Sequence, residues 1–268
     1  MPRLCFEIAY NGFGFSGWQS QPDGTAIQDH FRKVLEIALR IKDPWLVAAS
    51  RTDAGVHAEM QVVAVDISEP IPDLLKLQRS LNALLPSSIG IRSIVVTAPD
   101  FHPVYQAVAK VYRYRLWTGS WDNPFFAQYV WRIRKPRDTS ALLRNLRGVC
   151  GTHDFSSFCA ADSSAKTRVR TILDVQMVVS DDLIDIWIQG SGFLKQMIRN
   201  IAGTLVDLDL ERLTAAPDMV GILSLRDRTM AGRTAPAQGL SLVHIDFAQV
   251  TPLKEVALQA DRGFKVAL

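Results

Sequence analysis

The sequence predicts a protein of two similar α/β lobes, because strand–helix–strand patterns recur in both halves of the chain. With 268 residues, the chain is long enough for two modest hydrophobic cores. The stretch TAPDFHPVYQAVA, which contains two prolines and a histidine, separates the two patterns near residue 105. We therefore predict an N-terminal lobe over residues 1–105 and a C-terminal lobe over residues 106–268.

The first half predicts three strands and two helices. Apolar residues alternate with other residues over 4–10, which is typical of a half-buried strand. Residues 27–39 carry an apolar stripe at helical spacing. A strand pattern over 61–67, a helical pattern over 73–86 and a second strand pattern over 89–97 complete this half.

The second half has a similar order of elements. A strand is predicted over 110–117, a helix over 139–149 and a hairpin over 174–190 with its turn at residues 180–182. A helix follows over 193–208, and a strand over 239–247 closes the pattern. The resemblance between the halves is compatible with an old duplication, although their sequences are not similar enough to demonstrate one.

Composition and cysteine content narrow the class of protein. The chain is 48% hydrophobic and 21% charged, and it has no apolar run near the eighteen or so residues that a membrane span needs. Its three cysteines, Cys5, Cys150 and Cys159, are odd in number and widely spaced, unlike a disulfide framework or a metal site. No signal-peptide pattern opens the sequence. We expect a cytoplasmic protein that does not bind a membrane.

Cations are concentrated beside aromatic residues in two segments, KVYRYRLW at 110–117 and VWRIRKPR at 130–137. The net charge is only +3, so the clustering of the cations is a better indicator of a binding partner than the total charge. A solvated charged face is one explanation. Contact with nucleic acid is the other, because bases stack on aromatic rings while phosphates attract cations.

The strand predicted over 110–117 separates its tyrosines from its arginines. Side chains alternate across a strand, so Tyr112 and Tyr114 share one face while Arg113 and Arg115 share the other. We expect the tyrosines to face a cleft or the core and the arginines to meet phosphates or solvent.

The loop GFGFSG at 12–17 follows a predicted strand and matches the spacing of a dinucleotide fingerprint. That fingerprint also requires a helix to begin at the glycines, whereas WQSQPDGT delays the next helix to about Thr25. Thr25 and Gln28 there have capping-box spacing. We expect a turn-rich loop and keep a nucleotide-cofactor enzyme as a weaker reading.

Two further polar groups are candidates for chemistry. His153 lies near Cys159, as in a nucleophile–base pair, but GTHDFSSF also resembles a helix start with its capping residues. Asp53 lies in the bend RTDAG between apolar segments, where an acid followed by Ala-Gly is also a common turn. Residue types alone leave both structural explanations open.

The bend belongs to a longer motif, RTDAGVHA, that resembles the signature of the tRNA pseudouridine synthase A family. Other blocks resembling that family occur in the expected order along nearly the whole chain. They are YNGFGFSGWQSQP, LNALLP, FHPVYQAVAKVYRY, GTHDFSSF, GFLKQMIRNIAGTL and DRTMAGRTAPAQGLSLVHIDF.

This resemblance implies an α+β fold in which two similar lobes, with mixed and mainly antiparallel sheets, join around a central basic cleft. It implies a homodimer that uses no cofactor and no metal. The implied reaction is isomerisation of uridine to pseudouridine in the anticodon arm of tRNA, at positions thirty-eight to forty.

The resemblance also assigns roles to five residues. Asp53 would be the catalytic aspartate, and Arg51 would help to hold the flipped nucleotide. Tyr112 would pack on the target base, Arg199 would pair with the aspartate, and Leu240 would line the base pocket. The chain departs from the family at Ser50, where glycine is usual, at Asn11, where aspartate is common, and at Pro103, where arginine is frequent.

The implied chemistry suits a carboxylate. Isomerising uridine breaks and remakes one bond without redox change, so a nucleophile or charge stabiliser is what the enzyme must supply. Asp53 could attack the ribose, attack the base or remove a proton, and a guanidinium such as that of Arg199 would stabilise its charge. The alternative is a non-catalytic RNA-binding or RNA-folding protein, for which a carboxylate facing an anionic ligand would serve no purpose.

Overall fold

The computed structural model describes residues 2–136 and 138–263, whose contacts divide the chain into two compact units. Unit 1 extends to Val108 and takes up Ser241–Val250, while unit 2 comprises Ala109–Leu240 and continues from Thr251. The change of unit falls three residues after the predicted lobe boundary at 105/106. The return of residues 241–250 to unit 1 has no counterpart in the predicted division.

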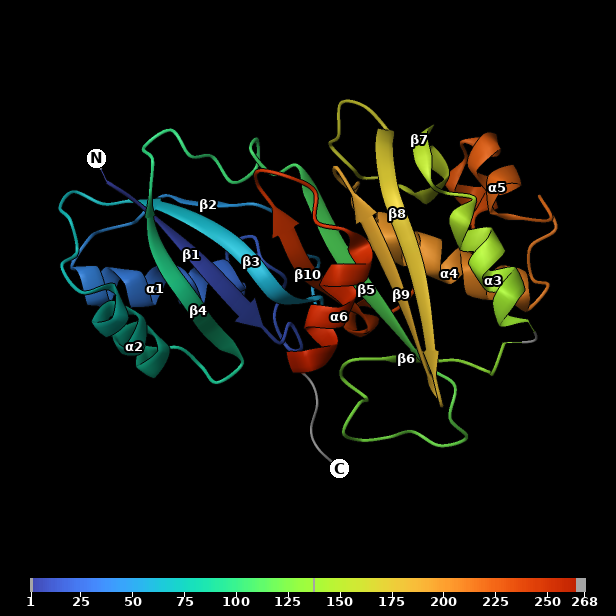
Figure 1. Ribbon diagram of the computed structural model, residues 1–268, viewed down its shortest axis with the longest axis horizontal. Helices are drawn as coiled ribbons and strands as arrows, with labels where there is room; N and C mark the ends of the chain where they lie inside the picture. Colours follow the sequence, from blue (N-terminus) through green and yellow to red (C-terminus); the bar gives the residue numbers. More distant parts are fainter. Residues whose placement is uncertain (1, 137, 264–268) are drawn as a thin grey trace. The chain divides into compact units, whose positions relative to one another are not determined.

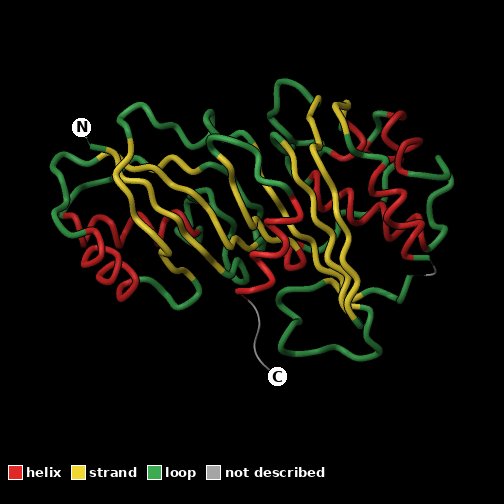
Figure 2. Tube along the Cα trace, viewed as in Figure 1, coloured by secondary structure: helices red, strands yellow, loops and turns green. Residues whose placement is uncertain are grey.

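Unit 1 consists of sheet strands together with the helices α1 and α2 (Figures 1 and 2). Its strands run in the order β4-β1-β3-β10, with β2 paired to β3. All these pairs are antiparallel except β10 with β3, which is parallel. The elements are β1 (Arg3–Tyr10), α1 (Ile27–Leu39), β2 (Leu46–Ala48), β3 (His57–Asp66), α2 (Leu74–Leu84), β4 (Ile89–Thr97) and β10 (Leu240–Asp246).

The apolar stripe of α1 packs on the sheet of unit 1. Phe31 meets Phe6 of β1 edge to face, with ring centroids 5.2 Å apart, and both side chains are fully buried. Burying a side chain of this size contributes about 1.5–3 kcal/mol. Ile27, Val34 and Leu35 are buried on the same stripe, so the helical prediction and its buried face are confirmed.

The predicted cap of this helix is wrong. The carboxylate of Asp29, and not the side chain of Gln28, accepts a hydrogen bond from the backbone N–H of the N-cap residue, Ala26, at 3.2 Å. Thr25 instead donates its hydroxyl to Ser16 at 2.9 Å. The acidic side chain is the stronger acceptor at the positive end of a helix, which explains the shift by one residue.

The strands of unit 2 are antiparallel neighbours in the order β5-β9-β8-β7, with the short β6 paired in parallel to β5, and they belong to the same ten-stranded sheet as those of unit 1. The strands of unit 2 are β5 (Ala109–Trp117), β6 (Trp131–Arg132), β7 (Gly151–Asp154), β8 (Val169–Ser180) and β9 (Leu183–Gly190). Its helices are α3 (Thr139–Arg147), α4 (Met197–Asp209), α5 (Met219–Leu225) and α6 (Leu253–Gly263). Separate helices beside mixed, mainly antiparallel strands confirm the α+β class.

The hairpin predicted in the second half is confirmed. β8 ends at Ser180 and β9 begins at Leu183, with Asp181 in the left-handed conformation at a φ of 48°. A short polar residue tolerates this conformation better than a branched one, which suits the tight connection.

The expected solvent exposure of Arg113 and Arg115 is wrong. Arg113 is 2% exposed and its guanidinium lies 5.0 Å from the centre of the Trp187 ring, a cation–π contact. Arg115 forms an ion pair with Asp185 at 3.1 Å, and both side chains are mostly buried. Alternate residues on both faces of β5 are buried, while α4 contacts β5 and α6 contacts the neighbouring β8 and β9. These arginines are therefore structural groups of unit 2.

Lys110 in β5 generates a prediction about pH. Burial lowers its pKa to about 8, from an ordinary value of 10.5. Between these values the unfolded chain binds more protons than the folded one, so this residue makes the free energy of unfolding rise with pH.

We predict that Lys110→Met removes a rise on the order of 1–3 kcal/mol across this window, since one unit of pKa corresponds to about 1.4 kcal/mol. Denaturant titrations of both proteins at neutral and alkaline pH measure the difference. An equally steep rise in the variant would contradict the assignment to Lys110.

Candidate functional site

Asp53 lies in an irregular bend of unit 1 between β2 and β3. Ala54 and Gly55 form a turn, closed by a hydrogen bond of 3.1 Å from the Val56 N–H to the Asp53 carbonyl. Arg51 is exposed and Asp53 is half-buried. A half-buried carboxylate on a fixed backbone is suited to contact with a ligand.

The glycine-rich loop over residues 12–18 holds this bend in place. The Trp18 N–H donates to the Thr52 carbonyl at 3.1 Å, and the Gly55 N–H donates to the Phe15 carbonyl at 3.3 Å. Gly17 has a φ of 96°, and a Cβ at this position would lie 2.7 Å from the Thr52 carbonyl oxygen. The loop is therefore a support for the Asp53 backbone. The next helix begins only at Ile27, and the loop lacks the helix start that a dinucleotide fingerprint requires.

Buried polar contacts fix the bend from its other side. The hydroxyls of Tyr10 and Thr52 are 2.8 Å apart, and the Tyr10 ring stacks on Trp18 at 6.1 Å. His57, which is 3% exposed, accepts a hydrogen bond of 3.0 Å from the Gly12 N–H through Nδ1. The histidine of the RTDAGVHA motif therefore ties the strand after the bend to the loop.

Ser50 is accommodated without strain. Its N–H donates to Oε1 of Gln61 at 3.2 Å, and its carbonyl accepts from Nε2 of Gln61 at 2.7 Å. Gln61 is fully buried. Ser50 does not have a positive φ, so nothing in the backbone here requires the glycine that the family usually carries.

In unit 2, Arg199 is fixed to the segment that leads into β10. Its Nε donates to the Ala235 carbonyl at 2.8 Å, while the Ala235 N–H donates to the Arg199 carbonyl at 3.1 Å. The Tyr114 hydroxyl donates to the next carbonyl, that of Pro236, at 2.8 Å. Burial raises the pKa of Tyr114, and the nearby Arg199 charge opposes this rise. Leu240, which is 6% exposed, ends the segment.

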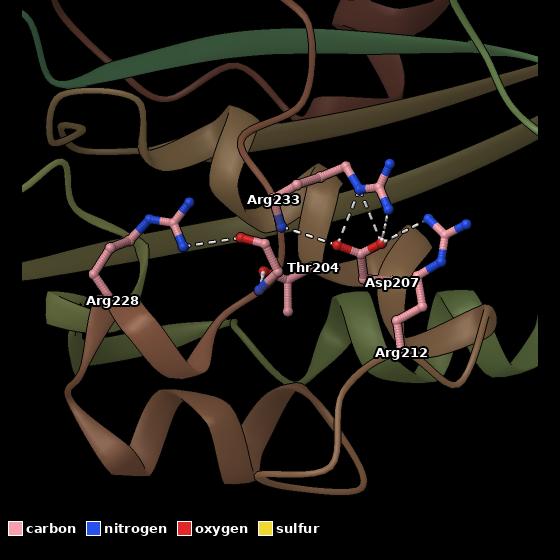
Figure 3. Close-up of polar contacts among 6 residues, drawn as sticks. Thr204, Asp207, Arg212, Arg228 and Arg233 are labelled. Atoms are coloured by element: carbon pink, nitrogen blue, oxygen red, sulfur yellow. Dashed lines mark hydrogen bonds and ion pairs between the residues drawn. The ribbon is translucent and has the colours of Figure 1, made fainter.

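Three polar side chains of α4 hold the same segment, and two of them, Thr204 and Asp207, are labelled in Figure 3. Asn200 accepts from the Thr234 hydroxyl at 2.7 Å, and Thr204 accepts from the Gly232 N–H at 3.0 Å. These contacts repeat one turn apart along one face of the helix.

Asp207 completes this face. Its carboxylate accepts from the Arg233 N–H at 2.9 Å and from Arg233 Nε at 3.0 Å, and it also pairs with Arg212 at 3.5 Å. The Asp207 side chain is 5% exposed, so its charge is both buried and compensated. Sequence reasoning missed these residues, although polar positions 200, 204 and 207 in an otherwise apolar helix were a usable signal.

The five predicted site residues fall into two groups. Arg51 and Asp53 share the bend of unit 1, and Tyr112, Arg199 and Leu240 lie in unit 2. Tyr112 is 6% exposed and its ring meets Phe193 edge to face at 5.1 Å.

The Cys–His pair considered from the sequence does not form: a ring nitrogen of His153 bonds to the Cys150 carbonyl at 2.7 Å. In place of the alternative helix start, GTHDFSSF forms β7 followed by a short 3₁₀ turn.

Comparison with known proteins places this geometry in a family. Residues 147–248 match the family model described as tRNA pseudouridine synthase. A protein of Shouchella clausii named tRNA pseudouridine synthase A is 38% identical over 251 residues, covering 93% of this chain and 95% of the relative. The protein of the same name from Bacillus subtilis is 37% identical, covering 91% of this chain and 98% of the relative. The chain belongs to the tRNA pseudouridine synthase family.

Both groups of site residues lie inside the region of family similarity. The family model covers Arg199 and Leu240, along with the polar face of α4. A match that spans 93% of the chain also includes the Asp53 bend and the central strands of both units. The resemblance inferred from the motifs is thereby confirmed.

The support that Gly17 gives to the bend can be tested by stability. We predict that Gly17→Ala lowers the free energy of unfolding by about 1–3 kcal/mol more than Gly14→Ala, because the added Cβ must displace the Thr52 backbone. Gly14 is a matched control, since it also has a positive φ, 84°, but a Cβ there would meet nothing within 4 Å. Denaturant unfolding measures both variants, and equal losses would contradict a supporting role for Gly17.

Proposed function

We propose that this protein isomerises uridine to pseudouridine in tRNA, with Asp53 as its catalytic group. The observation that carries the proposal is the half-buried Asp53 in a bend whose backbone is fixed by the glycine-rich loop. Family membership supports the reaction. A carboxylate fixed in this way can act on a bound nucleotide without first paying the entropic cost of ordering its own backbone.

The reaction needs only what these side chains can supply. The bond from ribose C1′ to uracil N1 breaks, the uracil turns, and a bond from C1′ to C5 forms. A proton leaves C5 and a proton joins N1, so atoms and charge balance without redox chemistry. Asp53 would act against the ribose or the base, or accept the C5 proton, and Arg199 would stabilise its negative charge.

The target uridine must leave its stack before this chemistry, at a cost of a few kcal/mol. We propose that Tyr112 packs on the released base, since base–aromatic stacking contributes about 1–3 kcal/mol. Arg51, exposed on the Asp53 bend, would hold the flipped nucleotide through its phosphates. Leu240 would line the base pocket, and the contacts of Ala235 and Pro236 would position the segment that carries it.

The finer features of the substrate and assembly follow from the same resemblance. We propose that the targets are uridines of the tRNA anticodon arm, at positions thirty-eight to forty, and that the protein acts in the cytoplasm as a homodimer. Among the helices in residues 2–136 and 138–263, none has the length and apolar character needed to cross a membrane.

The decisive experiment follows loss of the C5 hydrogen. We predict that the wild-type protein releases tritium from tRNA labelled at uracil C5, and that Asp53→Asn lowers this rate by about 1000-fold or more, as is usual for a group that takes part in bond making. The variant keeps its affinity for tRNA, because only one carboxylate oxygen is replaced. Asp100→Asn, at an exposed position of unit 1, is the control. Release by Asp53→Asn at the wild-type rate would exclude the catalytic role.

A further inference from the structure

The sequence has a second segment in which cations lie beside aromatic residues, VWRIRKPR at 130–137, and the proposed reaction does not use it. Three of its cations are exposed: Arg132 ends β6, and Arg134 and Lys135 follow it, so all three lie at the end of the long excursion of the chain after β5, the loop of residues 118–135. Arg137 lies outside the described residues. Figure 1 shows this loop at the end of unit 2 where β8 and β9 turn. The Thr118 N–H donates to the Asp182 carbonyl of that turn at 2.7 Å.

The two ends of the loop enclose an open concavity of about 530 Å³. Its lining includes Thr118, Gly119, Ser120, Arg132, Arg134 and Lys135. The described residues that line the concavity include these three cations and no carboxylate. Asp122, outside the lining, pairs with Arg132 at 3.1 Å, and the exposed Asp181 and Asp182 lie in the turn that Thr118 contacts. The lining itself is therefore cationic, with Arg134 and Lys135 as its exposed charges.

The loop is ordered around Trp117, the last residue of β5. The Trp117 indole N–H donates to the Trp121 carbonyl at 2.8 Å, and its ring lies 6.0 Å from that of Phe126. The Ile133 N–H returns a bond of 2.8 Å to the Trp117 carbonyl. These contacts join the start, the middle and the end of the loop to one buried residue, through its indole ring and its backbone carbonyl.

A turn at Asn123 then sends one aromatic ring outward. The side-chain oxygen of Asn123 accepts from the Phe125 N–H at 3.0 Å, and its carbonyl accepts from the Phe126 N–H at 3.0 Å. Phe126 packs inward on Trp117, while Phe125 is 85% exposed. Trp121, beside the concavity in the chain, is 55% exposed. The Phe125 ring therefore buries little apolar surface within unit 2.

We propose that this loop, residues 118–135, is a second RNA-binding surface that contacts the tRNA away from the isomerised nucleotide. Arg134 and Lys135 bind phosphates, and Phe125 stacks on an unpaired base. The proposal rests on the proposed function, because it takes tRNA as the ligand. Exposed cations beside exposed rings are the combination by which proteins hold single-stranded RNA regions.

The charges favour RNA over a second copy of the chain. In a two-fold interface centred on this patch, the cations of one copy would lie near the cations of the other. The cores of protein interfaces are also depleted in charged residues. RNA offers phosphates to the cations and unpaired bases to the rings.

Binding of an unmodified full-length tRNA transcript tests the role of the ring. We expect Phe125→Ala and Phe125→Leu to weaken binding about fivefold or more, and Phe125→Trp to keep it, because only the tryptophan retains a stacking face. Trp45→Ala, which removes a ring that is 78% exposed in unit 1, is the matched control and should change affinity less than twofold.

The double variant Arg134→Ala, Lys135→Ala tests the phosphate contacts. The logarithm of its binding constant should fall less steeply with the logarithm of salt concentration, by a slope of about 1–2 for two lost contacts. Tritium release at saturating tRNA should keep the wild-type rate in Phe125→Ala, Phe125→Leu and the double variant, with a higher KM, whereas Phe125→Trp and Trp45→Ala should keep the wild-type KM.

The outcomes separate this proposal from the proposed function. Wild-type affinity in Phe125→Ala and in the double variant would overturn the RNA surface, even while the wild-type protein isomerises uridine. Weaker self-association of Phe125→Ala in sedimentation, at unchanged tRNA affinity, would show a protein interface instead and would also overturn it. If these variants bind tRNA more weakly but the wild-type protein releases no tritium, the RNA-binding surface would be supported and only the proposed reaction would be rejected.

Discussion

The close approach of Gly17 to the backbone of Thr52 is the contact on which the Asp53 site depends. The bend around Asp53 has one internal turn and lies outside the regular ladder of the sheet. Its position is set by main-chain bonds to the glycine-rich loop and by the Tyr10–Thr52 contact. The bonds to the loop join backbone atoms and do not involve the Asp53 carboxylate.

In unit 2, side chains rather than main-chain groups hold an irregular segment in place. The segment from Gly232 to Leu240 is irregular for most of its length, and α4 supplies the groups that its backbone needs. Asn200, Thr204 and Asp207 bond to consecutive parts of the segment, so a polar face is retained in an otherwise buried helix. Each such group is satisfied, which removes the cost of burying it. Arg199 takes its orientation from the same arrangement.

The spacing of apolar residues predicted most strands and helices well, but it predicted poorly which of their side chains are buried. Alternation identified β1 and the β8–β9 hairpin, because each of these depends on residues close in sequence. It failed for Arg113 and Arg115, because a strand buried on both faces can bury a cation under Trp187 or against Asp185. Such compensation comes from residues more than sixty positions away, which periodicity cannot register. α6, which covers part of unit 2, was missed for a different reason: no predicted element extended past residue 247.

The candidate site could be identified from family-like motifs but not from the physical properties of its residues alone. The bend RTDAG alone was compatible with an ordinary turn, and only its place among other family-like blocks pointed to Asp53. The loop GFGFSG was correctly expected to be turn-rich, but its function as a support needed the structure, because the Gly17 contact joins segments some 35 residues apart. Gln61, which clamps Ser50, carried no signal in the sequence at all.

The central claim is that the position of the Asp53 carboxylate, fixed by the bend, decides catalysis. The most direct test is the single-turnover rate of pseudouridine formation by Asp53→Glu, which keeps the charge and moves it outward by one methylene. A displacement near 1 Å can cost about 100-fold in rate, and a loss of this size with retained tRNA binding is the predicted result. A rate within a few-fold of the wild type would show that charge alone suffices and would contradict the claim.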